Sequence, residues 1–145
     1  MVKKKNLEKT AFMYRMELIW EFFLIRKEIS KEKIKILIEG NSDDHYKNVD
    51  ESFKIAEKLD KDKYEIYYLS YQGGAKSWYR VDKFLQRVPH DEVGKIYQSC
   101  DILLKTSYFG KLFVSTIRMM AAGGLAVVSD QMEEIIEYLR DEKIV

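Results

Sequence analysis

From residue 33 onward the sequence alternates short apolar runs with amphipathic helical segments, and this alternation constrains the fold more than any other feature. The run KIKILIE (33–39) has the period of a strand, and VDESFKIAEKL (49–59) has apolar residues at helical spacing. Strands that alternate with helices form right-handed crossovers, which place the strands in one parallel sheet covered on both faces. The predicted fold class is therefore α/β, a Rossmann-like parallel sheet of about five strands with helices on both faces.

The remaining elements follow from the same two periods. Further strands are predicted at 64–71, 83–88, 101–107 and 124–129, and further helices at 90–100, before Gly123, and at 131–142. Gly123 and Gly124 suit the end of a helix and a tight entry into the next strand. The run LAVVS (125–129) has no polar alternation, which indicates a strand buried on both faces.

The N-terminal segment differs from the rest of the chain. Residues 6–29 place apolar side chains on a wide helical face, beside a narrower polar stripe that includes Glu17 and Glu21. We therefore divide the chain into an N-terminal amphipathic helix with its linker (1–32) and a Rossmann-like domain (33–145). The wide face is expected to cover exposed sheet or helix surface, or to form a homodimer. Membrane contact is the weaker option because of the glutamates.

Composition narrows the functional classes. A chain of 145 residues is long enough for one domain with a substantial core. Its formal net charge of +1 implies no broad basic surface, so nucleic acid is not an expected partner. Cys100 is the only cysteine, which favours an intracellular protein without disulfides, and with only two histidines the chain offers little for a zinc site. Since the sequence shows no signal peptide, a cytoplasmic location is expected, with the membrane periphery as an alternative.

Two loops are expected to form the binding site. Ligands of open parallel sheets bind beyond the carboxyl ends of the strands, where the strand order reverses, and the loops after ILIE (36–39) and ILLKTS (102–107) face that crevice. Lys47 precedes a helix in the first loop and is a candidate diphosphate ligand, with a solvated loop charge as the alternative. Thr106 and Ser107 end the fourth strand, where their hydroxyls suit capping of the next helix or phosphate binding.

Four further residues are candidates in the loops. Gly110 and Lys111 would combine close backbone approach with a positive charge. Trp78 and Tyr79 could stack on a base or sugar, although half-buried aromatic residues of a sheet are the more common case. No Walker-type or GxGxxG spacing is present.

Four passages occur in a distinctive order along residues 33–142. They are KIKILIEGNSDDHYKNVDESFKIAEKL, RVPHDEVGKIYQSCDILLKTS, FVSTIRMMAAGGLAVVSD and EEIIEYL. Together they resemble the C-terminal, donor-binding domain of GT-B-fold glycosyltransferases, in particular the large retaining family (group 1-like) that uses nucleotide-diphosphate sugars. The third passage is similar to the family's LEAMAxGxPVV segment.

The resemblance implies a UDP-, GDP- or dTDP-sugar as donor substrate, with no separate cofactor and no metal. In the family a lysine after the first strand contacts the diphosphate, and Lys47 stands at that position. The family also has two glutamates separated by seven residues, one near the sugar and one on the ribose hydroxyls. Gly110 and Arg118 stand at these two positions, so both glutamates are replaced.

We therefore expect the nucleotide-sugar-binding domain of a glycosyltransferase of polysaccharide or glycoconjugate biosynthesis, with weak or no activity as an isolated chain. A guanidinium cannot accept the hydroxyl protons that a carboxylate accepts. Acceptor-binding residues would come from another domain or subunit, which closes with this one around the sugars. One alternative is a degenerate, non-catalytic GT-B-like domain with a binding or scaffold role. A small flavodoxin-like module ranks last.

Overall fold

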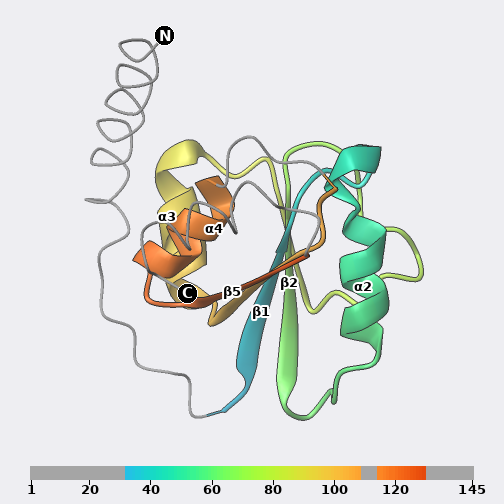
Figure 1. Cartoon of the computed structure of the whole chain (residues 1–145), viewed down its shortest axis with the longest axis horizontal. Coiled ribbons are helices and arrows are strands. Elements are labelled where there is room, and N and C mark those ends of the chain that lie inside the picture. Colours follow the sequence, from blue (N-terminus) through green and yellow to red (C-terminus); the bar gives the residue numbers. More distant parts are fainter. Residues whose placement is uncertain (1–31, 109–113, 130–145) are drawn as a thin grey trace, which may run out of the picture.

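Five parallel strands form one sheet in the order β3-β2-β1-β4-β5 (Figure 1). The computed structural model describes residues 32–108 and 114–129. Its strands are β1 (Ile34–Glu39), β2 (Tyr64–Ser70), β3 (Lys83–Gln86), β4 (Ile102–Lys105) and β5 (Leu125–Val128). In the same ranges lie the 3₁₀ helix η1 (His45–Lys47) and the α-helices α2 (Val49–Glu57), α3 (His90–Ser99) and α4 (Val114–Ala121). The predicted α/β fold class is confirmed.

The strand order reverses between β1 and β4. β1 pairs in parallel with both β2 and β4, and the chain reaches β4 only after it has moved outward through β2 and β3. From β4 it continues to β5 at the other edge. The loops that follow β1 and β4 therefore lie at the point where ligands of such sheets bind. These are the two loops that the sequence predicts to face the crevice.

Helices cover both faces of the sheet, with α2 on one face and α3 and α4 on the other (Figure 1). Successive side chains of a strand point to opposite faces, so the strands contribute to two separate cores. The core on the α2 side contains Ile36, Ile38, Val49, Phe53, Ala56, Ile66, Tyr68, Tyr79 and Leu104. The core on the α3 and α4 side contains Leu37, Tyr67, Tyr97, Cys100, Leu103, Met119, Ala121 and Ala122.

Helix α2 shows how the sequence specifies one of these layers. Val49, Phe53 and Ala56 recur at a spacing of three to four residues and are all buried. Asp50 and Glu51 lie in the first turn, where negative charge is favourable to the helix dipole. The helix therefore packs its apolar stripe on the sheet and keeps its acidic residues at the amino end.

The prediction that LAVVS is buried on both faces is wrong for the strand within it. β5 lies at the edge of the sheet, and Leu125 and Val127 are 60% and 44% exposed. Helix α4 packs against β5 from one face, whereas α2 packs on β1, β2 and β4 on the other face. An apolar run without alternation does not distinguish a central strand from an edge strand, because both use the same residue types.

Two predicted elements, the N-terminal helix over residues 6–29 and the closing helix over 131–142, lie outside the described residues. Among the described residues, no helix has the length and apolar character needed to cross a bilayer.

Candidate functional site

A cavity of about 540 Å³ lies at the carboxyl ends of β1 and β2, beside the amino end of α3 and a side chain of α4. Its lining includes Glu39, Gly40, Asn41, Lys47, Leu69, Ser70, Tyr71, Arg87, Val88, Pro89, His90, Val93, Tyr97 and Arg118. We refer to it as the β1–α3 cavity. It combines apolar walls with several charged groups, which is the general character of small-molecule sites.

Glu39, which lines this cavity, forms an ion pair with Lys105, whose Nζ lies 2.8 Å from Glu39 Oε2. Glu39 ends β1 and Lys105 ends β4, and both point to the α3 and α4 side because Leu37 and Leu103, two residues earlier, do. Burial alone would raise the pKa of the Glu39 carboxyl, but the Lys105 ammonium and the Ser115 hydroxyl hold that pKa below its ordinary value. Glu39 is therefore a carboxylate at neutral pH.

Tyr97 and Arg118 connect the ion pair to the helices. Tyr97 on α3 is completely buried, and burial raises the pKa of its phenol well above the ordinary value. The Glu39 charge raises this pKa further, and the positive charge of Arg118 partly offsets the rise. Arg118 Nη2 also lies 3.4 Å from His90 Nε2. The guanidinium thus stands between the α3 amino end and the phenol.

Lys47 lines the same cavity from η1, and the turn before it depends on Gly40. Gly40 has a φ of +149°, and a Cβ there would lie 3.0 Å from Val49 Cγ2 and 3.3 Å from Lys47 Cβ. Asp44 caps η1 by accepting a 3.0 Å hydrogen bond from the Tyr46 N–H. A glycine is therefore needed where β1 turns closely under the segment that carries Lys47.

Arg87 enters the cavity lining from the end of β3 with an unusual backbone conformation. Its φ is +53°, in the left-handed region that residues other than glycine and asparagine rarely adopt. The Arg87 N–H donates a 3.1 Å hydrogen bond to the Ser70 carbonyl, which holds the turn against β2. Strained residues of this kind gather at functional sites, so Arg87 is a candidate the sequence reasoning did not single out.

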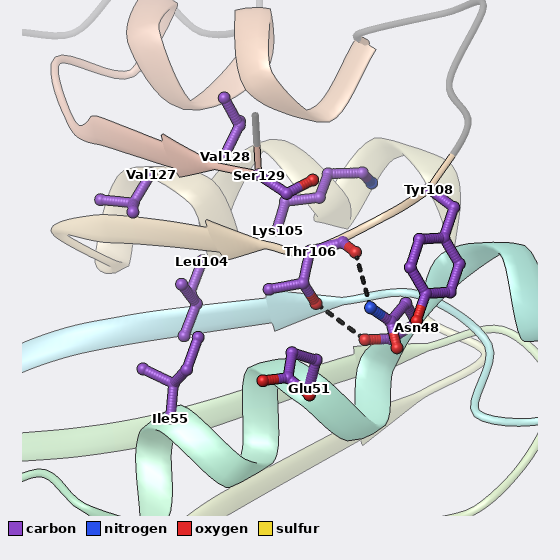
Figure 2. Close-up of a pocket in the computed structure, with 10 residues that line it drawn as sticks. All are labelled: Asn48, Glu51, Ile55, Leu104, Lys105, Thr106, Tyr108, Val127, Val128 and Ser129. Carbon is purple, nitrogen blue, oxygen red and sulfur yellow. Dashed lines mark hydrogen bonds between the residues drawn. The ribbon is translucent and has the colours of Figure 1, made fainter. Parts of the chain in front are cut away.

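Thr106 lines a different cavity, of about 370 Å³, on the α2 side of β4 and β5 (Figure 2). Its Oγ1 donates a 2.7 Å hydrogen bond to the Asn48 carbonyl and lies 2.8 Å from Ser52 Oγ. The Thr106 carbonyl accepts a 3.1 Å hydrogen bond from Asn48 Nδ2. These bonds attach the loop after β4 to the start of α2, whereas the sequence suggested capping of the following helix.

Ser107 is fully buried and lines neither of these two cavities. Its hydroxyl donates to the Lys47 carbonyl at 3.4 Å, and its carbonyl accepts a 2.9 Å hydrogen bond from Ser129 Oγ. Of the predicted site residues, the structure therefore brings Lys47 and Arg118 into one cavity and places Thr106 in another. Gly110 and Lys111 lie outside the described residues.

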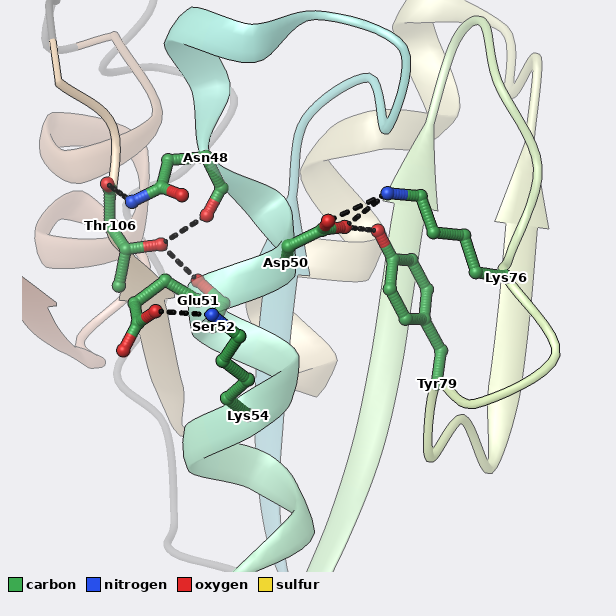
Figure 3. A network of polar contacts seen from close by, with 8 residues as sticks. All are labelled: Asn48, Asp50, Glu51, Ser52, Lys54, Lys76, Tyr79 and Thr106. Atoms are coloured by element: carbon green, nitrogen blue, oxygen red, sulfur yellow. Dashed lines mark hydrogen bonds and ion pairs between the residues drawn. The ribbon is translucent and has the colours of Figure 1, made fainter.

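The loop before β3 is attached to α2 by a charged network (Figure 3). Lys76 Nζ lies 2.7 Å from both carboxylate oxygens of Asp50, and the Tyr79 hydroxyl donates to the same carboxylate. Burial of Asp50 would raise its pKa, but the hydrogen bonds from Lys76 and Tyr79 lower it overall. Tyr79 also stacks on Phe53, with 3.8 Å between ring centroids. It is thus a core residue, and Trp78 beside it is 45% exposed.

The sequence reasoning missed Glu39, Lys105, Tyr97 and Arg87 as site residues. The ion pair has a possible sequence signal, because two predicted strands end in residues of opposite charge, Glu39 and Lys105. These residues follow Ile38 and Leu104, which are in register in the sheet. No comparable signal marked Arg87, since its conformation depends on the turn into α3.

Among the described residues, no three histidine, cysteine, aspartate or glutamate side chains gather around a possible metal position.

Comparison with known proteins adds no family to this description. The chain matches no protein-family model, and no curated protein is similar enough to match it.

Proposed function

We propose that the β1–α3 cavity binds the diphosphate of a nucleotide sugar, and that the chain is a donor-binding domain of the GT-B glycosyltransferase type. The observation that carries this proposal is the convergence of Lys47, Arg87 and Arg118 on one cavity at the reversal of strand order. Cationic side chains at such a crevice are suited to phosphate oxygens, and arginine can bind two of them at once.

The amino end of α3 supports the same assignment. Pro89 precedes the helix without a side-chain cap, and both Pro89 and His90 line the cavity. The uncapped N–H groups and the helix dipole favour an anion at this end. Asp91 and Glu92 follow in the first turn, but neither lines the cavity, and Glu92 is 2.8 Å from Lys95. These two carboxylates partly offset the helix dipole, but an anion in the cavity would not contact them directly.

Donor binding without turnover is the expected behaviour of the isolated chain. Arg118 stands where the resembled family uses a glutamate to hold the ribose hydroxyls, and a guanidinium has no acceptor. Losing charged hydrogen bonds of about 1.5–3 kcal/mol corresponds to roughly ten- to a hundredfold weaker binding of a ribose in the usual pose. Transfer would in addition need an acceptor-binding domain or subunit. A binding or scaffold role without transfer is the second candidate, and Arg118 is the observation that favours it.

Isothermal titration of the full chain with UDP, GDP and dTDP tests the proposal. We expect one of them to bind, and Lys47→Gln to weaken that binding about tenfold or more, because it removes a charged contact of about 1.5 kcal/mol or more. Lys58→Gln is the matched control, because it removes the same charge from an exposed residue at the end of α2, outside the cavity. No heat with any of the nucleotides at millimolar concentration would refute the proposal.

A further inference from the structure

The α2-side face of β4 and β5 exposes apolar side chains. In the register of the sheet, Leu125 lies beside Ile102 and Val127 lies beside Leu104. Leu104 belongs to the core on the α2 side, so Leu125 and Val127 point to that same face. Both side chains are exposed. A parallel sheet is normally covered on both faces, so this face calls for a further element.

Helix α2 borders this face and makes it a groove. Ile55 of α2 lines the 370 Å³ cavity together with Leu104 and Val127, and Ile55 is also exposed (Figure 2). We refer to the surface formed by Ile55, Leu104, Leu125 and Val127 as the β5 groove. It has two apolar walls, one from a helix and one from the sheet. A helix that lies in it must therefore be apolar toward both walls.

Residues 6–29 have the wide apolar face that these two walls require. Their apolar residues form two adjacent stripes at helical spacing. The first stripe contains Phe12, Met16, Ile19, Trp20 and Phe23, and the second contains Leu18, Phe22, Ile25 and Ile29. A helix over residues 6–29 would be about 36 Å long, whereas a strand of the length of β5 spans about 13 Å. The groove would therefore take only the part of the segment nearest to β1.

The connection to β1 is long enough for this placement. Lys33 Nζ donates a 2.9 Å hydrogen bond to the Lys61 carbonyl, so the chain enters β1 close to the carboxyl end of α2. A helix packed beside α2 would lie about 8–10 Å from the α2 axis. Residues 30–33 can span up to about 14 Å when extended. Since β1 pairs directly with β4, the segment reaches the groove without crossing the rest of the sheet.

The predicted helix over residues 131–142 is a less suitable occupant. Helix α4 connects β4 to β5 on the face opposite to α2 (Figure 1). A right-handed crossover that continued in the same direction beyond β5 would lie on the α4 face as well. The apolar residues of this segment also form one narrow stripe, which consists of Met132, Ile135, Ile136 and Leu139.

We propose that residues 6–29 dock in the β5 groove beside α2, within the same chain, and complete the helical layer on this face of the sheet. The part of the segment nearest to the linker, with Phe22 and Ile25, packs on β4 and β5. The inference is independent of the proposed function, because the β5 groove shares no residue with the lining of the β1–α3 cavity.

Engineered disulfides test the docking on the full chain. Val127→Cys is combined in turn with a cysteine at each position of the second stripe, in the variants Leu18→Cys, Phe22→Cys, Ile25→Cys and Ile29→Cys. A disulfide requires Cα atoms within about 7 Å, so we expect at least one pair to form a bond within one chain under mild oxidation. Cys100 is completely buried and should not compete.

Phe84→Cys, combined with the same four positions, is the matched control. Phe84 stacks on Tyr68, on the α2 side of the sheet, and its exposure is similar to that of Val127. It lies on β3, at the opposite edge of the sheet from β5. We expect the yield of disulfide with Phe84→Cys to be about tenfold lower or less.

The fluorescence of Trp20 gives a second measurement. The chain has two tryptophans, so Trp78→Phe leaves Trp20 as the only one. In this background we expect Val127→Asp to raise the acrylamide quenching constant of Trp20 at least threefold, and Phe84→Asp to leave it unchanged. Circular dichroism of each variant shows whether the domain is folded. The disulfide test does not depend on the stability of the aspartate variants.

Each contrary result would overturn the inference. A disulfide between two chains would place a second copy in the groove. A bond from Val127→Cys to Ile135→Cys or Leu139→Cys, in place of the second stripe, would assign the groove to residues 131–142. No bond, equal yields with Phe84→Cys, or Trp20 quenching that Val127→Asp leaves unchanged would refute docking in the β5 groove. Since none of these measurements involves a nucleotide, the proposed function would be unaffected.

Discussion

Replacing Glu39 with glutamine should destabilise the domain more than replacing Lys105 with methionine, although both changes break the same ion pair. The Lys105 side chain is 7% exposed and the Glu39 side chain is 29% exposed. Glu39→Gln leaves a buried ammonium without its carboxylate, and breaking a buried pair in this way costs about 3–5 kcal/mol. Because Glu39 is partly exposed, we expect the lower end, about 3 kcal/mol. For a domain of this size, that lowers the thermal midpoint by about 10 °C.

Lys105→Met leaves the carboxylate in a more favourable position. Glu39 keeps the Ser115 hydroxyl and the field of Lys47, and it is in partial contact with solvent. The expected cost is therefore only about 1.5–2 kcal/mol, the lower part of the range for a lost hydrogen bond to a charged group. The double variant Glu39→Leu, Lys105→Met should be more stable than Glu39→Gln alone, because apolar replacement of both partners removes the stranded charge.

The effect of pH follows from the lowered pKa of Glu39. A carboxyl whose folded pKa lies below its unfolded pKa stabilises the folded state above the unfolded value, and that contribution is lost as pH falls through the folded pKa. Urea denaturation of the wild type and Glu39→Gln should thus show a full difference at pH 7 that narrows below about pH 4.5. A difference that stays constant down to pH 3, or a Lys105→Met variant less stable than Glu39→Gln, would refute this reasoning.

Three other changes test the structure by urea or thermal denaturation. Arg87→Asn should raise stability by about 0.5–1 kcal/mol, because asparagine tolerates the left-handed backbone; a loss of stability would contradict the assigned strain. Thr106→Ala should cost about 1–3 kcal/mol because it leaves Ser52 Oγ and the Asn48 carbonyl without Oγ1, and Thr106→Ser should retain most of the stability. Gly124→Ala should cost about 1–3 kcal/mol, since a Cβ would clash with Met119 Sδ and lie 2.9 Å from the Asp101 carbonyl oxygen; an unchanged midpoint would argue against this packing.

Much of the fold could be predicted from the sequence because the evidence for it is local. Hydrophobic period predicts each described strand and α-helix, and the right-handed crossover rule predicts a parallel sheet. The 3₁₀ helix η1 lies in a segment that the sequence predicts as a loop. The exposed face of β5 could not be predicted in the same way. Leu125 and Val127 are apolar whether or not a helix covers them, and coverage depends on where α2 packs, which is a tertiary property.

The candidate site was less accessible to sequence reasoning than the fold. Lys47 was found because a lysine before a helix has a general use, and the structure places it in the β1–α3 cavity. Thr106 is recognisable in the sequence as a polar residue at a strand end. Its hydroxyl, however, bonds to Asn48 and Ser52 at the start of α2, which lie 58 and 54 residues earlier in the chain. A hydroxyl in a loop has several possible partners at similar cost, and only the tertiary arrangement selects one.

The polar groups at the carboxyl edge of the sheet are of two kinds. Some form hydrogen bonds or ion pairs within the protein, and others line the cavity. Thr106, Ser52 and Asn48 satisfy one another, and Glu39 with Lys105 forms an ion pair. These groups hold the loops at the reversal of strand order, so their loss should appear first as lost stability.

Two of the cations that line the β1–α3 cavity behave differently. Lys47 is only partly buried and Arg87 is exposed and strained, so neither side chain is needed for packing. Like charges gathered in one cavity repel each other, and this repulsion costs stability that a bound anion would offset. Removing such a cation should therefore weaken binding while leaving the domain as stable or more stable. If replacing a cavity residue lowers both the affinity for the ligand and the free energy of unfolding, that residue stabilises the structure rather than binding the ligand.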